Sequence, residues 1–212
     1  AVKFITEKYR IGKAFVPSLC EPSSLPLYSE SVNALKGVTD IIVYDISTNI
    51  IGNDYFIAFL SPESEESTNA FYDALNNSFS VSDLDYVSPI IYLEYKGIRF
   101  VFASESSSSA QNEVYDRYLA GLYDLSLNDS GRSVDLYNVD FLKVSNHGSA
   151  SHYSYSFAGV LKPRNVIFSL AGDNSFGYPS TSVLSDLAEL NPEVRFLRTD
   201  VLGSVTVNVT EG

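Results

Sequence analysis

The sequence predicts a globular domain of layered α/β or α+β architecture, in which helices cover β-sheets. Two β-hairpin patterns, at 88–103 and 194–209, flank segments whose apolar residues follow strand spacing and helix spacing in turn. Such a mixture is typical of sheets with helices packed on them. The chain has 212 residues, 45% of them hydrophobic, which is enough for one sizeable core. We therefore expect a single domain over residues 1–212.

The N-terminal half contains three strand patterns, at 11–16, 40–46 and 55–60. Between the first two, a loop rich in Pro and Ser leads into a short helix that Ser29 could cap. The stretch STNIIGND separates the second strand pattern from the third. The acidic stretch SPESEEST that follows is typical of a loop or of a short helix with a solvated face.

The C-terminal half begins with the hairpin at 88–103, whose turn is Lys96-Gly97. A helix follows, and its inward residues at helical spacing are Tyr115, Tyr118, Leu119, Leu122 and Leu125. A strand over 139–145, a helix over 155–161 and a strand over 165–171 come next. Ser180 is placed to cap a further helix that ends at 190, and the second hairpin turns through Asp200 to Gly203.

The balance of charge bears on possible partners. With 26 acidic and 14 basic side chains the chain carries a formal net charge of −12, so it repels phosphate backbones as a whole. We expect no broad basic surface for nucleic acid, whereas a protein partner is compatible with this charge. No run of 18 apolar residues predicts a membrane span, and no signal-peptide pattern precedes the first strand. Cys20 is the only cysteine, so the chain cannot form an internal disulfide.

Four motifs occur in a fixed order: RFVFASE at 99–105, LKVSNHGS at 142–149, DNSFGYPS at 173–180 and RTDVLGSVTV at 198–207. Together they resemble the metallo-β-lactamase-like domain of the DNA-uptake competence protein ComEC. The corresponding pieces of that family are a strand ending TGD, then LKV-x-HHGS, N-x-YGHP and RTD-x-x-G-x-I. The resemblance covers roughly residues 86–209. It implies an αββα sandwich of the α/β class with a site between the sheet edges, and it implies that part of the N-terminal half of that fold is lacking.

The family's chemistry uses divalent zinc or manganese, held by His and Asp, to activate a water that attacks a phosphodiester. This chain departs from the ligand set that the resemblance implies. Asn146 stands where the family has the first histidine of HHGS, Tyr178 replaces the histidine of the HP pair, and Glu105 falls on the aspartate of TGD. The family's HxHxDH cluster has no counterpart, because His147 and His152 are the only histidines.

His147 and Glu105 are therefore the candidate metal ligands, and each has an ordinary alternative. His147 is more typical of a histidine hydrogen-bonded within its own turn, and Glu105 is otherwise an ordinary solvated acidic residue. His152 reads as a surface loop residue.

The remaining candidates for a catalytic or binding role are Asn146, Asp173, Asn174 and Tyr178. Asp173 and Asn174 could orient a substrate, but Asx residues in such loops more often cap turns through their own backbone. Tyr178 could mimic a phosphate-binding hydroxyl, although an aromatic ring filling a vacated metal pocket is the more ordinary role.

The leading hypothesis is a degenerate ComEC-type metallo-β-lactamase-like domain, free of metal or weakly metal-binding, that serves as an interaction or scaffold module. The alternative is an active metal-dependent phosphodiesterase whose HxHxDH half lies upstream of Ala1 or on another chain. A third class, a binding module for protein or carbohydrate, rests on the 15 tyrosines. The resemblance favours an extracytoplasmic setting, where the family's domain is expected to meet incoming DNA.

Overall fold

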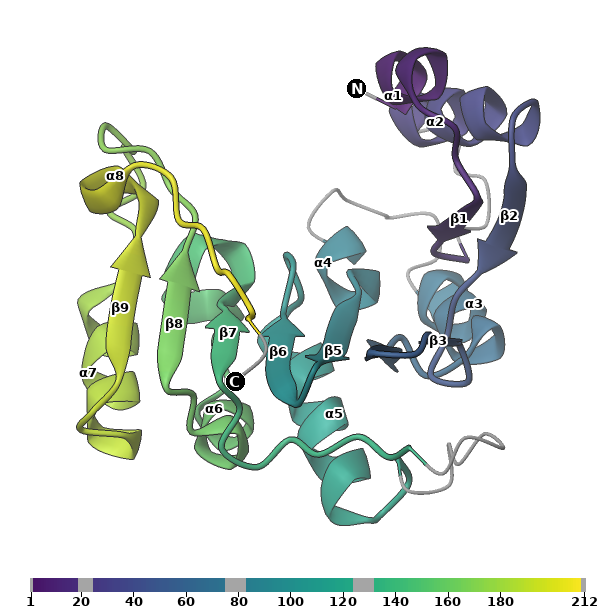
Figure 1. The fold of residues 1–212 in the computed structure, drawn as a ribbon. Helices are drawn as coiled ribbons and strands as arrows, with labels where there is room; N and C mark the ends of the chain where they lie inside the picture. The colour runs from purple at the N-terminus through teal and green to yellow at the C-terminus, as the bar shows by residue number, and fades with distance from the viewer. Residues whose placement is uncertain (1, 19–24, 75–82, 124–131, 211–212) are drawn as a thin grey trace.

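A seven-stranded sheet forms the centre of the molecule in the computed structural model, which describes residues 2–18, 25–74, 83–123 and 132–210. The strands lie in chain order across the sheet (Figure 1): β3 (Asn49–Ile51), β4 (Tyr55–Ser61), β5 (Ile90–Tyr95), β6 (Ile98–Phe102), β7 (Phe141–Lys143), β8 (Asn165–Phe168) and β9 (Arg195–Arg198). Neighbours are antiparallel from β3 to β6 and parallel from β6 to β9. The expected α/β class is confirmed.

Three helices cover one face of this sheet: α5 (Ser108–Leu119), α6 (Tyr155–Leu161) and α7 (Thr181–Leu190). The side chains of Tyr92, Val101, Leu142 and Val166 form one row across β5 to β8, and each is at most 3% exposed. Val114, Phe157 and Val183 of the helices belong to the same buried cluster. The expected pairing of the strand before Val144 with the strand that begins at Asn165 is confirmed, as is the helix packed outside them.

The opposite face of the sheet carries the C-terminal segment 204–210. This segment runs in extended form across the parallel strands (Figure 1), and its residues 204–208 line a cavity together with Phe141, Asn165 and Leu197. Valines 205, 207 and 209 are half-buried, whereas the residues between them are exposed. Among the described ranges the only further sheet is the parallel pair β1–β2, so one large sheet with one helical layer corresponds to half of the expected sandwich.

The expected C-terminal hairpin is wrong. Residues Thr199–Leu202 form the short helix α8, and 204–210 makes no ladder with β9 within the described residues. The physical reason lies in side-chain bonds at the end of β9. The Thr199 hydroxyl donates to the carbonyl of Leu170 at 2.7 Å and accepts from its N–H at 2.8 Å. Asp200 lies in the turn of α8 and not in a hairpin turn, and it pairs there with Arg198, whose hydrogen bond lowers the pKa of the Asp200 carboxyl.

The N-terminal residues form a smaller unit beside β3 and β4. It comprises α1 (Val2–Lys8), β1 (Lys13–Val16), α2 (Pro26–Lys36) and β2 (Asp40–Val43), and α3 (Glu65–Ala74) and α4 (Leu84–Val87) follow along the chain. Phe59 joins this unit to the large sheet, because its ring lies 4.6 Å from that of Tyr44 and 5.6 Å from that of Phe15. No helix in the described part of the chain is long and apolar enough to cross a membrane.

Three local details of the helices and strands differ from those that the sequence predicts. Helix α2 begins at Pro26, three residues before the expected cap Ser29, because proline is preformed for the first helical turn. The stretch 49–51, expected to separate two strands, is itself strand β3. Of the expected inward residues of α5, Tyr115 and Tyr118 pack on the core, Leu119 and Leu122 are exposed, and Leu125 lies outside the described residues.

Helix α5 also carries a buried arginine, which the pattern of apolar residues did not predict. The Arg117 side chain is 9% exposed, and its guanidinium donates to the Leu60 carbonyl and to the Tyr123 hydroxyl, each at 3.3 Å. Tyr123 in turn donates to the same carbonyl at 2.7 Å. These bonds tie α5 to the end of β4.

We expect Arg117→Met to lower the free energy of unfolding by about 1–3 kcal/mol, because it removes buried charge-assisted hydrogen bonds while keeping the volume of the stem. Urea denaturation followed by circular dichroism measures the change. Arg164→Met is the control, since that side chain is 70% exposed and its loss should cost at most about 0.5 kcal/mol. Equal effects of the two substitutions would contradict a structural role for the buried guanidinium.

Candidate functional site

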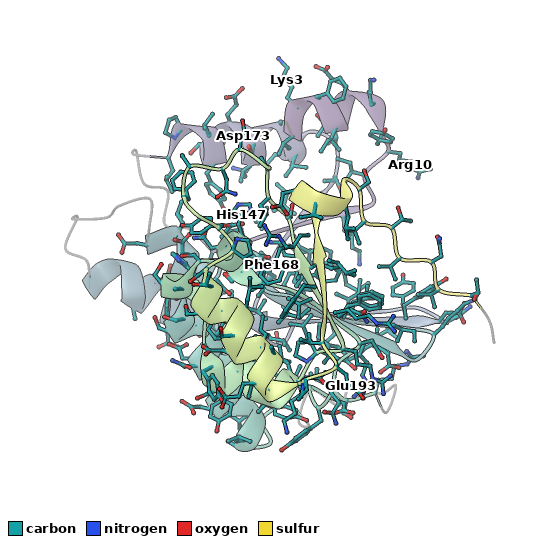
Figure 2. All side chains as sticks on the ribbon, turned by 90° about the vertical axis from the view of Figure 1, so that its left-hand side faces the viewer. Lys3, Arg10, His147, Phe168, Asp173 and Glu193 are labelled. Carbon is teal, nitrogen blue, oxygen red and sulfur yellow. The ribbon has the colours of Figure 1, made fainter. Side chains whose placement is uncertain are left out.

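The candidate site lies where the parallel strands β6, β7 and β8 end at the same edge of the sheet. Each strand is followed by a loop that carries polar side chains: Ser104 and Glu105 after β6, Asn146 and His147 after β7, and 169–178 after β8. Ligands of open α/β sheets bind at such carboxyl ends. Figure 2 shows His147 beneath the loop that carries Asp173.

The turn after β7 has an unusual backbone. Asn146, His147 and Gly148 have φ values of 38°, 55° and 87°, all in the left-handed region. Gly148 is required there for a second reason, because a Cβ atom would lie 2.8 Å from the ring of Phe168 and 2.8 Å from Pro179. The sequence Asn-His-Gly thus folds into a tight turn that points two polar side chains toward the edge of the sheet.

Hydrogen bonding assigns the tautomer of the neutral His147 ring. Its Nδ1 contacts the carbonyl oxygen of Ser169, and a carbonyl only accepts, so Nδ1 carries the proton. In the neutral ring Nε2 is then an acceptor, and it lies 3.9 Å from Oε1 of Glu105. The His147 and Tyr178 rings are nearly parallel, 15° apart, with centroids separated by 6.5 Å.

Glu105 is shared between His147 and a lysine. The ammonium of Lys143 lies 3.8 Å from the same Oε1 and donates to the Ser104 carbonyl at 3.1 Å. Burial lowers the pKa of Lys143, and the neighbouring carboxylate opposes that shift. The Glu105 charge is therefore partly countered within the protein.

A cavity of about 380 Å³ opens beside His147. Its lining residues are Asn146, His147, Leu170, Ala171, Asn174, Phe176 and Tyr178. Asn174 shapes the loop over it: its side chain accepts from the Tyr178 N–H at 2.9 Å and donates to the Tyr178 carbonyl at 3.1 Å. Four candidates from the sequence therefore line one cavity, and Glu105 lies against His147. Asp173 is exposed at the loop (Figure 2) and is not among the lining residues.

These residues do not fit a divalent metal centre of the kind that the resemblance implies. A catalytic zinc takes three protein ligands and a two-metal site needs more, whereas this locus offers one imidazole nitrogen and one carboxylate. Asn146 contributes an amide and Tyr178 a phenol, which are poor ligands for zinc. In the part of the chain that the structure describes, no group of three or more His, Cys, Asp or Glu side chains is placed to share one ion.

His152 was expected to be a surface loop residue; it lies in the short turn Ala150–His152, and its side chain is bonded more extensively than that expectation implies. Its side chain is 20% exposed, with Nε2 2.9 Å from Oδ2 of Asp85 and Nδ1 2.9 Å from the Ser151 hydroxyl. Its backbone carbonyl accepts from the Gln111 amide at 2.6 Å. These contacts join the turn after His147 to α4 and α5. No spacing in the sequence could have revealed them, because Asp85 and His152 are 67 residues apart.

We expect Gly148→Ala to destabilise the protein more than Gly97→Ala, by about 1–3 kcal/mol. Both glycines have left-handed backbones, so each substitution carries a conformational cost of about 1–2 kcal/mol. Only Gly148 has close neighbours, and an added methyl group there overpacks against Phe168 and Pro179. Urea denaturation of the two variants compares them directly. Equal losses would show that the close approach at Gly148 is relieved without cost.

Comparisons with known proteins show a distant structural likeness. The chain is similar to the metallo-beta-lactamase fold protein YhfI from Bacillus subtilis, with 9% sequence identity and a TM-score of 0.41. The likeness covers 92% of this chain, which spans about 66% of that protein's length. No protein-family model matches the chain, and no curated protein matches its sequence.

Proposed function

We propose that this chain is a ComEC-type metallo-β-lactamase-like domain whose metal site has degenerated, and that it acts as a non-catalytic binding module. The observation that carries the proposal is the pocket beside His147. At the position where the resemblance implies metal ions, the chain presents a single His147–Glu105 pair at 3.9 Å together with an asparagine and aromatic rings.

The arrangement of the four motifs supports the assignment to this domain type. LKVSNHGS and DNSFGYPS are separated along the chain, yet residues of both line one cavity, and Glu105 of RFVFASE lies 3.9 Å from His147. The RTD motif lies alongside, because Thr199 bonds to Leu170 of the cavity wall. The proximity of segments that were matched only by short patterns supports the proposal of a common site.

The chemistry of the donor set supports a binding role over hydrolysis. Activation of water by metal depends on ligands that hold the ion and leave one position open. This locus offers one imidazole and one carboxylate, and the carboxylate is already paired with Lys143. It therefore provides neither the number of ligands nor the negative charge that such an ion needs. A cavity of about 380 Å³ lies at this locus, so the site has a shape in which a ligand can lie.

One observation favours the alternative, an active phosphodiesterase completed by an HxHxDH segment upstream of residue 1 or on another chain. The acceptor Nε2 of His147 and the carboxylate of Glu105 face one another, as two ligands of one cation would. Direct metal titration separates the two functions.

We expect calorimetric titration with Zn²⁺ and with Mn²⁺ to show binding no tighter than an exposed His–carboxylate pair gives, and His147→Ala to change it little. Hydrolysis of bis(p-nitrophenyl) phosphate should be equal with and without either metal. His152→Gln is the matched control for the second histidine. Stoichiometric tight binding, with turnover that His147→Ala abolishes and His152→Gln retains, would establish the enzyme and refute the binding module.

A further inference from the structure

We infer that the cavity beside His147 binds a neutral saccharide, with one or two sugar rings placed against its aromatic wall. This assignment rests on the proposed binding function and names the class of ligand for the same site.

Aromatic side chains form one wall of the cavity. The rings of Phe176 and Tyr178 are 14° from parallel with centroids 5.6 Å apart, and the His147 ring continues the series at 15° from Tyr178. The Phe176 side chain is 77% exposed at the rim. The electron-rich faces of such rings attract the weakly positive C–H groups of a ligand, and a sugar ring presents several of these on one side.

Polar groups at the same cavity are available for hydroxyl groups. Within the described residues no hydrogen bond engages the Asn146 side-chain amide or the Tyr178 hydroxyl, although both residues line the cavity and are half-buried. At the edge of the cavity, Nε2 of the neutral His147 ring and Oε1 of Glu105 are two acceptors 3.9 Å apart. Adjacent hydroxyls of a sugar can donate to both acceptors, and further hydroxyls can meet the amide and the phenol.

The local charge selects a neutral ligand. No lysine or arginine is among the lining residues, and the chain carries a net charge of −12, so an anionic ligand such as a phosphate gains nothing there. An organic cation gains little, because the Lys143 ammonium already lies 3.8 Å from the Glu105 carboxylate. The volume of about 380 Å³ lies near the lower end of the range of about 300–1,000 Å³ found for ligand pockets, which suits a small ligand.

Saturation-transfer NMR on the whole chain, in the presence of EDTA, tests this assignment with glucose, galactose and N-acetylglucosamine as separate probes. We expect transfer to the ring C–H protons of at least one of them. Phe176→Ala should weaken that binding about tenfold by removing one aromatic contact, and Tyr178→Phe should weaken it several-fold by removing only a hydroxyl. Tyr9→Ala, which removes a 66% exposed ring after α1, is the matched control and should leave binding unchanged.

The saccharide assignment would be overturned if none of the three sugars showed transfer, or if Phe176→Ala showed the same transfer as the unaltered chain. It would also be overturned if adenosine or choline displaced a bound sugar at a lower concentration than the same sugar, added as a competitor, needs to displace it. Circular dichroism of each variant shows that it is folded, which the exposure of Phe176 leads us to expect. Because EDTA removes metal from this assay, its outcome is independent of the calorimetric titration. Weak metal binding together with no transfer to any sugar would refute the saccharide assignment but not the proposed binding function. Tight metal binding with turnover would refute the proposed binding function itself.

Discussion

The left-handed turn at Asn146, His147 and Gly148 is the constraint on which the site depends. Its backbone is bonded on both sides: the Asn146 N–H donates to the Ser104 carbonyl at 3.1 Å, and the Gly148 carbonyl accepts from the Ser180 N–H at 2.9 Å. The turn therefore fixes the end of β6 and the start of α7 relative to β7. Non-glycine residues adopt this conformation at a cost of about 1–2 kcal/mol each, and asparagine tolerates it best. The flanking hydrogen bonds and the packing of Gly148 against Phe168 offset that cost.

The same turn holds the pocket in place independently of which side chains line it. Backbone geometry and close packing hold the loops in place, and neither depends on an ion. Replacement of a ligand side chain by Tyr178 or Asn146 then alters what the cavity attracts without altering where it lies. A fold constrains the position of a site much more than its reactivity. In this chain the cavity is lined by aromatic and amide side chains together with His147, and such groups bind through surface contact and hydrogen bonds.

Local signals in the sequence predicted local structure well. The Lys96-Gly97 turn has positive φ at both residues, as the hairpin pattern requires, and the helix at 155–161 has the predicted bounds. The signals failed where partners are remote. The alternating valines at 205–209 indicate that one side of the segment is buried, but they do not indicate what covers it. The segment was therefore expected to pair with a neighbouring strand, whereas it packs on the face of the sheet. The contacts of Arg117 and His152 could not be predicted, because their partners Leu60 and Asp85 lie far away along the chain. A candidate site could be proposed from the sequence because its motifs occur in a fixed order as well as having a characteristic composition.

The C-terminal segment has a consequence for how the molecule opens. Within the described residues, no backbone hydrogen bond links 204–210 to a strand, so the segment is held by its three half-buried valines and not by a ladder. Its amides should exchange with solvent far faster than those of β9, and its release costs much less than global unfolding. Such a local opening would bare Phe141 and Leu197 while the helical side of the sheet stays intact. The helix-covered face of the sheet thus unfolds only with the whole molecule, whereas the face covered by 204–210 can open locally.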